Sequence, residues 1–129
     1  MRRLLLVLVV VWLGLGLWQC EHVDSQQRVD FYIDLTDPQY QDLYLTGGYV
    51  YVNNIIVFKG LDQNYYALSQ YCTNDVCVVQ YQVSFNEVVC TCDQSHFDIY
   101  GNPTFGPATY PLYRYATSLH GSMLRIYTP

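Results

Sequence analysis

Short stretches in which apolar and polar residues alternate recur along the chain from residue 29 onward. A period of two is typical of strands that bury one face. We find no stretch with a helical period that is long enough to predict a helix. Gly, Pro and Asn separate the alternating stretches, and Asn53-Asn54 fits a two-residue hairpin turn because asparagine tolerates a positive φ. The expected strands are 29–35, 48–52, 55–60, 64–70, 76–84, 86–90, 96–100, 106–116 and 123–128.

This pattern predicts an all-β domain of about ten short strands, arranged as a sandwich or a small barrel assembly. Fourteen tyrosines fit that prediction, since tyrosine suits half-buried strands whose hydroxyl groups reach the wet edge. They do not by themselves predict a ligand-stacking face. No Ser–His–acid or Cys–His arrangement stands out, and a nucleophile needs a positioned base. We therefore expect no enzyme activity.

The start of the chain has a different pattern, with two arginines followed by an uninterrupted apolar run from Leu4 to Trp18. The run is shorter than the roughly 20 residues that a helix needs to span a bilayer. A basic start followed by a short apolar run predicts a secretory signal peptide over residues 1–19.

The end of this segment, "LGLWQC", resembles the lipobox of bacterial lipoproteins, with Leu17 three residues before Cys20. Gln19 stands where a small residue is usual. We expect lipidation of Cys20, with the polar residues 20–28 as the tether between lipid and domain. The alternatives are a signal-anchor helix, or ordinary cleavage that leaves Cys20 as an unpaired thiol.

The charge balance excludes some partners. The chain has 6 basic and 11 acidic residues, and removal of Arg2 and Arg3 with the signal peptide would leave a net charge of −7. Nucleic-acid binding depends on Lys and Arg neutralising phosphates, so we expect no nucleic acid. Anionic lipid headgroups are also disfavoured, so the membrane would be reached through the lipid alone. We expect an exported lipoprotein that faces the periplasm or the cell surface.

Four of the five cysteines lie in two stretches, "CTNDVC" at 72–77 and "CTCDQSHFD" at 90–98. Cysteines of exported proteins persist as disulfides, and four cysteines permit three connectivities. Structural zinc sites usually use CxxC pairs, whereas the spacings here are CxxxxC and CxC. Zinc held by Cys72, Cys90 and Asp93, with His96 as a further ligand, is a less favoured alternative.

"CTNDVC", "CTCDQSHFD" and "GPATYPL" follow one another in an order that resembles the Rieske iron–sulfur domain family. The final "LRIY" at 124–127 is similar to the last strand of that family. The resemblance covers residues 29–129, with 70–116 as the cluster-binding type of subdomain, and is closest to small exported lipoproteins with degenerate Rieske domains. It implies a Rieske-like fold of short antiparallel strands in stacked small sheets.

The resemblance also implies roles for the residues of the two cysteine stretches. Cys72 and Cys90 match the cysteines that hold one iron, whereas Asn74 and Asp93 stand where two histidines hold the second iron. An amide oxygen is a poor ligand, and a carboxylate is a hard anion that would change the affinity and the potential. We therefore expect no cofactor. A 2Fe–2S cluster with non-histidine ligands is the alternative.

Cys77 and Cys92 match the further cysteines that link the two loops by a disulfide in respiratory-type Rieske proteins. Two cysteines that share one iron are close enough to pair when the iron is absent. The expected disulfides are therefore Cys72–Cys90 and Cys77–Cys92, each worth roughly 3 kcal/mol when it is alone.

Further matches concern the surroundings of the cluster. Ser95 corresponds to a serine that hydrogen-bonds the cluster, and Phe97 lacks the tyrosine hydroxyl of some members. Gly106, Pro107 and Ala108 match the loop that covers the cluster from a third side. The sequence thus predicts an exported Rieske-fold protein that has lost electron transfer and acts as a disulfide-stabilised structural or binding module. The alternatives are a 2Fe–2S electron carrier and a thiol–disulfide redox protein.

Overall fold

The computed structural model describes residues 28–129. The expected signal peptide over residues 1–19, the lipidation site Cys20 and the tether up to residue 27 lie outside the described residues. Within residues 28–129, no helix is long and apolar enough to cross a membrane.

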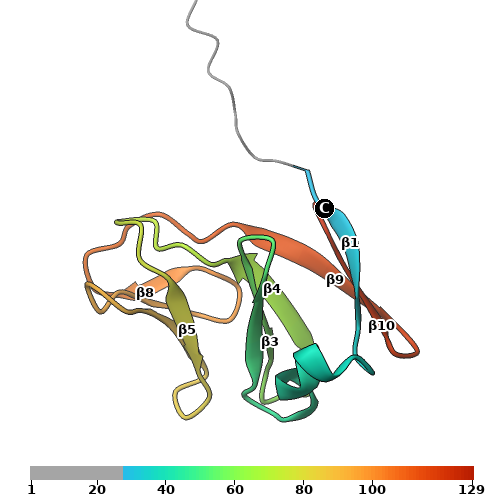
Figure 1. The fold of residues 1–129 in the computed structure, drawn as a ribbon. Coiled ribbons are helices and arrows are strands. Elements are labelled where there is room, and N and C mark those ends of the chain that lie inside the picture. The colour runs from blue at the N-terminus through green and yellow to red at the C-terminus, as the bar shows by residue number, and fades with distance from the viewer. Residues whose placement is uncertain (1–27) are drawn as a thin grey trace, which may run out of the picture.

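Ten strands form two antiparallel sheets in the described part of the chain (Figure 1). The strands are β1 (Asp30–Asp34), β2 (Tyr49–Val52), β3 (Ile55–Lys59), β4 (Tyr65–Ser69), β5 (Val79–Gln82), β6 (Glu87–Cys90), β7 (His96–Phe97), β8 (Pro103–Phe105), β9 (Arg114–His120) and β10 (Met123–Tyr127). The six-stranded sheet has the order β1-β10-β9-β4-β3-β2, and the four-stranded sheet has the order β5-β6-β7-β8. The prediction of an all-β domain with short antiparallel strands is confirmed.

Strand β3 joins two hydrophobic clusters because its residues 55–58 are buried on both faces. Ile56 and Phe58 pack with residues of the four-stranded sheet, and the Phe58 ring stacks on that of Tyr81 at 4.3 Å between centroids. Ile55 and Val57 face the other cluster, which includes strands β1 and β10. The uninterrupted apolar run "IIVF" is the sequence signature of such a fully buried strand.

The hairpin turn between β2 and β3 forms as predicted. Asn53 and Asn54 have φ values of 51° and 64°, in the left-handed region that asparagine tolerates. This turn sets the register of the two strands, in which Val52 pairs with Ile55.

A 3₁₀ helix, η1 (Pro38–Tyr44), was not predicted from the sequence. The Asp37 carboxylate accepts a hydrogen bond from the Gln39 N–H and Pro38 opens the helix, which is the usual chemistry of a helix start. Leu43 is fully buried and packs in the hydrophobic cluster that contains Ile55 and Val57 of β3. A helix this short shows no clear apolar period, so the pattern of the sequence does not reveal it.

The prediction of a strand over 106–116 is wrong for most of that range. Residues 106–113 form a loop and β9 begins at Arg114, continuing to His120. Gly106 has a φ of 91°, and Pro107 and Pro111 have no backbone N–H to offer to a ladder. Strand β8, which the sequence did not predict, lies just before this loop.

Candidate functional site

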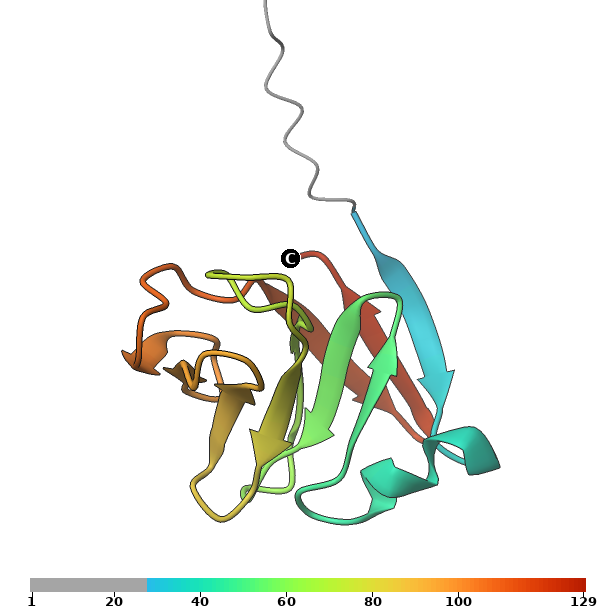
Figure 2. The same ribbon diagram turned by 60° about the vertical axis from the view of Figure 1, so that its left-hand side comes forward.

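Three loops that border the four-stranded sheet come together in space. The loop from β4 to β5 carries Cys72 and Cys77, and the segment from the end of β6 to β7 carries Cys90 and Cys92. The third loop connects β8 to β9. The first loop is folded back on itself, since the Cys72 N–H donates to the Cys77 carbonyl at 2.8 Å. In Figure 2 these loops lie on the left, around the four-stranded sheet, whereas β1 lies on the right.

Two disulfides join the first two loops. Cys72 is bonded to Cys90, with 5.8 Å between their Cα atoms, and Cys77 is bonded to Cys92, with 6.0 Å between theirs. These are the pairs that the resemblance implied. Cys72 and Cys90 are buried, whereas Cys92 is exposed. One bridge therefore lies in the core and the other at the surface.

Asn74 and Asp93, which the resemblance places at the two histidine positions, are hydrogen-bonded to each other. The Asn74 side-chain Nδ2 donates to Asp93 Oδ2 at 3.0 Å, across the two loops. Asp93 Oδ1 accepts from the Ser95 backbone N–H at 2.9 Å. The bond from Ser95, followed by the bond from Asn74, holds the pKa of Asp93 below its usual value. Asp93 is thus a carboxylate whose two oxygens already have protein partners.

Asp75 is a site residue that the sequence analysis missed. Its Oδ1 accepts from the Cys77 N–H at 2.8 Å and lies 3.8 Å from the Cys90 sulfur. It lies within 4.8 Å of the sulfurs of both bridges. The only signal in the sequence is its place two residues before Cys77, where an aspartate commonly accepts a backbone N–H in a turn.

The covering loop is fastened to both cysteine loops. The Ala108 N–H donates to Ser95 Oγ at 3.0 Å, and Ser95 is fully buried. Gly106 lies so close that an added Cβ would be 2.7 Å from the Ser95 Cα. On the other side, Thr73 Oγ1 donates to the Tyr110 carbonyl at 2.7 Å. The Ser95 hydroxyl therefore accepts a bond from the covering loop.

The structure does not bring together the ligands of the zinc alternative. His96 lies on β7, and its Nδ1 is 2.7 Å from Glu87 Oε2. Within residues 28–129, the groups with metal-ligand spacing combine Asp75 with either pair of bonded cysteines. Neither group contains Asp93 or His96, so this part of the zinc prediction is wrong.

Comparison with protein families gives a match over residues 31–116 to the Rieske [2Fe-2S] domain. The chain belongs to this family. The match covers the four-stranded sheet, the six-stranded sheet up to the start of β9, and all three loops, and it agrees with the resemblance drawn from the cysteine stretches. No curated protein sequence matches the chain.

Solved structures of Rieske proteins have the same fold. The plasma membrane Rieske protein PetC3 from the cyanobacterium Synechocystis PCC 6803 is 26% identical with a TM-score of 0.57, over 67% of this chain and 91% of that one. The ferredoxin of carbazole 1,9a-dioxygenase from Nocardioides aromaticivorans IC177 is 20% identical with a TM-score of 0.56, over 66% and 88%. The Sphingomonas yanoikuyae B1 ferredoxin is 18% identical with a TM-score of 0.56, over 66% and 89%.

The donor atoms of this Rieske domain, as they are arranged, do not fit a 2Fe–2S cluster. A Rieske cluster requires two cysteine thiolates on one iron and two imidazoles on the other. Here the sulfurs of Cys72 and Cys90 are bonded to each other, so neither is a thiolate. Asn74 and Asp93 offer an amide and a carboxylate that are engaged with each other. The arrangement can hold three loops together, and it presents no ready ligand set.

Proposed function

We propose that the chain is an exported, lipid-anchored Rieske-fold protein that has lost its iron–sulfur cluster and acts as a disulfide-stabilised structural or binding module. The observation that carries the proposal is the hydrogen bond between Asn74 and Asp93 beside the Cys72–Cys90 bridge. All four positions that would hold the irons are then occupied by contacts within the protein. Electron transfer through a cluster is lost, and the fold is kept.

Protein contacts replace the structural role of the iron in this proposal. A cluster ties the two cysteine loops together, and so does a disulfide. Closing a loop of this length stabilises a domain by about 3 kcal/mol in the chain-entropy estimate. The second bridge, Cys77–Cys92, joins the same loops and adds less, because the first already restricts them. The loops keep their mutual position without a metal.

The N-terminal pattern and the disulfides support export. Disulfides persist in oxidising compartments, and the apolar start of the chain ends at Cys20 in a lipobox-like sequence. The cyanobacterial relative is described as a plasma membrane protein. We propose that lipid on Cys20 holds the domain at the periplasmic or outer surface of a membrane.

Reconstitution with iron and sulfide under reducing conditions tests the loss of the cluster. The native chain is compared with a variant that carries Asn74→His and Asp93→His, which restores the imidazoles of the family. We expect a Rieske-type signal in absorption and low-temperature EPR from the double variant alone. A stable, reducible signal of that type from the native chain would contradict the proposal, whether or not the double variant also gives one.

A 2Fe–2S electron carrier with non-histidine ligands is the second candidate. Its support is the family itself, whose cysteines correspond to Cys72 and Cys90. It predicts that the reduced native chain takes up two irons for each protein molecule, with a signal shifted from the usual Rieske spectrum. The disulfide-stabilised module predicts no uptake, so iron analysis separates the two candidates.

A thiol–disulfide redox function is the third candidate, and the exposed Cys92 favours it. An exposed labile bridge has a higher reduction potential than a structural one, which typically lies below about −300 mV. Equilibration with a dithiol buffer followed by intact mass measurement gives the potential of each bridge. The same spectrum reports lipid on Cys20. Under the leading proposal both bridges resist mild reductant, and full reduction adds four hydrogens, two for each bridge.

A further inference from the structure

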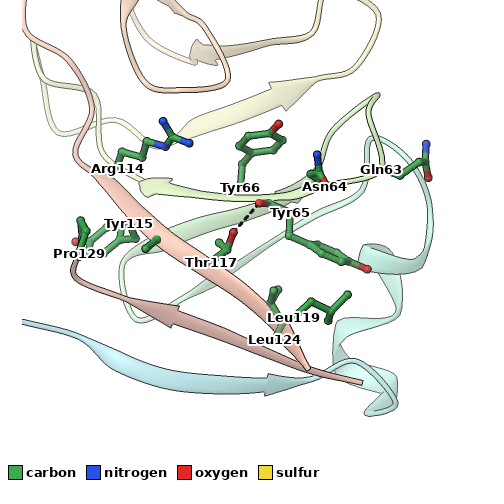
Figure 3. A pocket seen from close by; sticks show the side chains of 11 residues that line it. Gln63, Asn64, Tyr65, Tyr66, Arg114, Tyr115, Thr117, Leu119, Leu124 and Pro129 are labelled. Carbon is green, nitrogen blue, oxygen red and sulfur yellow. Dashed lines mark hydrogen bonds between the residues drawn. The ribbon is translucent and has the colours of Figure 1, made fainter. Parts of the chain in front are cut away.

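The six-stranded sheet is split between its two central strands. β4 and β9 pair at Ala67–Tyr115 and Leu68–Arg114, and the pairing ends there. Two residues beyond Tyr115, Thr117 Oγ1 donates to the Tyr65 carbonyl at 2.9 Å, so a side chain bridges the strands (Figure 3). Strand β4 begins at Tyr65, so beyond that bond β9 continues without a paired strand, beside a solvent-open groove of about 620 Å³.

The main chain of β9 has unpaired groups that point into this groove. In an antiparallel ladder, the N–H and C=O groups of successive residues point to opposite neighbours. At the two ends of the β1–β10 ladder, the Thr128 N–H donates to the Val29 carbonyl and the Leu35 N–H donates to the Ser122 carbonyl. Residues 122 and 128 therefore direct their main-chain groups toward β1. Residues 123, 125 and 127 of β10 therefore turn to β9, where they pair with residues 120, 118 and 116. By alternation, Thr117 and Leu119 direct their main-chain groups away from β10, toward β4.

Strand β4, whose first residues border the groove, shows the same alternation. The Ser69 N–H donates to the Tyr113 carbonyl, so residues 69, 67 and 65 face the β9 side. Tyr65 is the residue that would pair with Thr117 if the ladder continued. Its carbonyl instead accepts from the Thr117 hydroxyl. The edge of β9 from residue 117 to residue 120 is therefore left without a neighbouring strand on this side.

The floor of the groove is apolar. Leu119 pairs with Leu124, so the two side chains lie on the same face of the sheet, the face that covers the core. Leu124 is 1% exposed, whereas Leu119 is 51% exposed, and β4, which begins at Tyr65, does not extend as far as Leu119. Figure 3 shows both leucines beside the Tyr65 ring at the wide end of the groove.

Arg114 gives the groove a charge at its narrow end. Its guanidinium lies 4.6 Å from the centre of the Tyr100 ring. The salt bridges among residues 28–129 use Arg125 and His96, and the other side chains that line the groove are uncharged. In a chain with an excess of acidic residues, this cation marks where a carboxylate of a ligand is favoured.

We propose that the groove binds an extended peptide segment that adds as a strand to the free edge of β9 and places a carboxylate at Arg114. Strand addition takes its affinity from main-chain hydrogen bonds and its selectivity from pockets for alternate side chains. The edge from 117 to 120 accommodates about four residues at roughly 3.3 Å each. β-Branched residues that contact Leu119 and Leu124, followed by an acidic residue, fit its chemistry. This site is independent of the cysteine loops and of the cluster.

The test uses the ¹⁵N-labelled full chain and the peptide acetyl-Thr-Val-Thr-Val-Thr-Glu-amide. Two further peptides carry N-methyl groups on alternate residues, one set on each edge of the extended peptide. Before peptide is added, we expect the Thr117 and Leu119 amides to exchange quickly with solvent and those of Ser118 and His120 to be protected. Peptide should protect Thr117 and Leu119, and only one of the two methylated peptides should bind.

Substitutions at Leu119 and Arg114 test the peptide contacts at the two ends of the groove. Leu119→Asp should weaken peptide binding at least tenfold. Phe85→Asp should leave binding unchanged, because Phe85 lies in the turn between β5 and β6 and its side chain is 68% exposed. Replacing the glutamate of the peptide by glutamine should weaken binding to the native chain. The same replacement should have no effect on binding to the Arg114→Gln variant.

Three results overturn the proposal. The first is no amide shift at about 1 mM peptide. The second is equal binding of both methylated peptides, which shows that no edge of the peptide is used. The third is protection of Thr117 and Leu119 without peptide that rises with protein concentration, which assigns the groove to a second copy of the chain.

Discussion

At the scale of single residues, the hydrogen bond between Asn74 and Asp93, which the resemblance places at the two histidine positions, has a measurable effect on protonation. The pKa of Asp93 is lowered in the folded chain, so its bonds stabilise the fold above about pH 4 and stop doing so as the pH falls through the folded pKa. Asn74→Ala should raise the pKa of Asp93 part of the way to its usual value, since the Ser95 N–H still donates. An NMR titration of the carboxyl carbon measures this.

Asn102→Ala is the matched control, because Asn102 donates to Asp98 in the same geometry. It should leave the titration of Asp93 unchanged. An unchanged titration in Asn74→Ala as well would contradict the hydrogen bond across the loops.

Asp75 places a negative charge next to both disulfides. A thiolate that attacks either bridge approaches this carboxylate, and two unit charges about 4 Å apart in water repel by about 1 kcal/mol. Asp75→Asn keeps an oxygen for the Cys77 N–H and removes the charge. We expect reduction by dithiothreitol to become about fivefold faster. Intact mass against time measures it, and Asp98→Asn is the control that should not change the rate.

These two residues also show how far the sequence leads at this scale. The cysteine spacing and the order of the three motifs identify which cysteines share a site, because the family fixes those positions. The bond from Asn74 to Asp93 joins loops 19 residues apart, and its geometry depends on the backbone between them. The place of Asp75 beside Cys90 likewise depends on how the first loop folds against the second. Neither contact has a local signal in the sequence.

At the scale of elements, the covering loop depends on one glycine. Gly106 combines a φ of 91° with a position where a Cβ would be 2.7 Å from the Ser95 Cα and 3.0 Å from the Gln94 carbonyl oxygen. The Cβ of Gly106→Ala would therefore clash with two backbone atoms, which cannot move aside as a flexible side chain could. We expect the substitution to lower the free energy of unfolding by about 2 kcal/mol. Denaturant unfolding measures the change.

Gly121 provides the control for that substitution. It lies in the β9–β10 hairpin turn with a φ of 60°, and an added Cβ would meet nothing within 4 Å. Gly121→Asn places a residue that tolerates this conformation there, and it should change stability by only a few tenths of a kcal/mol. If both substitutions cost the same, the close approach of Gly106 to Ser95 is not what constrains the loop.

The elements that the sequence predicts well are those whose signal is local. The run "IIVF" predicts the buried strand β3, and Asn53-Asn54 predicts the hairpin turn, in each case from adjacent residues alone. The range 106–116 misled the prediction because its tyrosines and apolar residues suit a strand, while Gly106 and two prolines prevent one. The end of the pairing between β4 and β9 has no sequence signal, since it depends on where β4 begins relative to the longer β9.

At the scale of the whole molecule, the two sheets are held together by a shared core and by tyrosines that cross between them. Phe58 of β3 stacks on Tyr81 of β5, and the Tyr51 hydroxyl of β2 donates to the Val79 carbonyl of β5 at 2.6 Å. The cysteine loops at the far end of the small sheet are fastened by covalent bonds. Together these contacts explain how a Rieske fold remains one body without a cluster in our proposal.

The tyrosines make the stability of this molecule sensitive to base. Partial burial raises the pKa of Tyr51 to about 12, with Tyr49 adding to the shift, and burial followed by the bond to Asp62 raises that of Tyr66 to about 12. Groups with a raised pKa in the folded state stabilise it below their unfolded pKa of about 10, and this stabilisation is lost as the pH rises through the folded pKa. Stability should therefore fall between about pH 10 and pH 12.

Tyr51→Phe separates the two roles of this hydroxyl. At neutral pH the variant should be less stable by about 1 kcal/mol, because the Val79 carbonyl loses its donor between the sheets. Near pH 11 the difference should shrink, since phenylalanine has no proton to lose on unfolding. Tyr110→Phe, at a ring 72% exposed in the covering loop, should match the native chain at both pH values. Guanidinium unfolding at each pH measures these differences, and a constant gap between Tyr51→Phe and the native chain would show that Tyr51 does not contribute to the loss of stability in base.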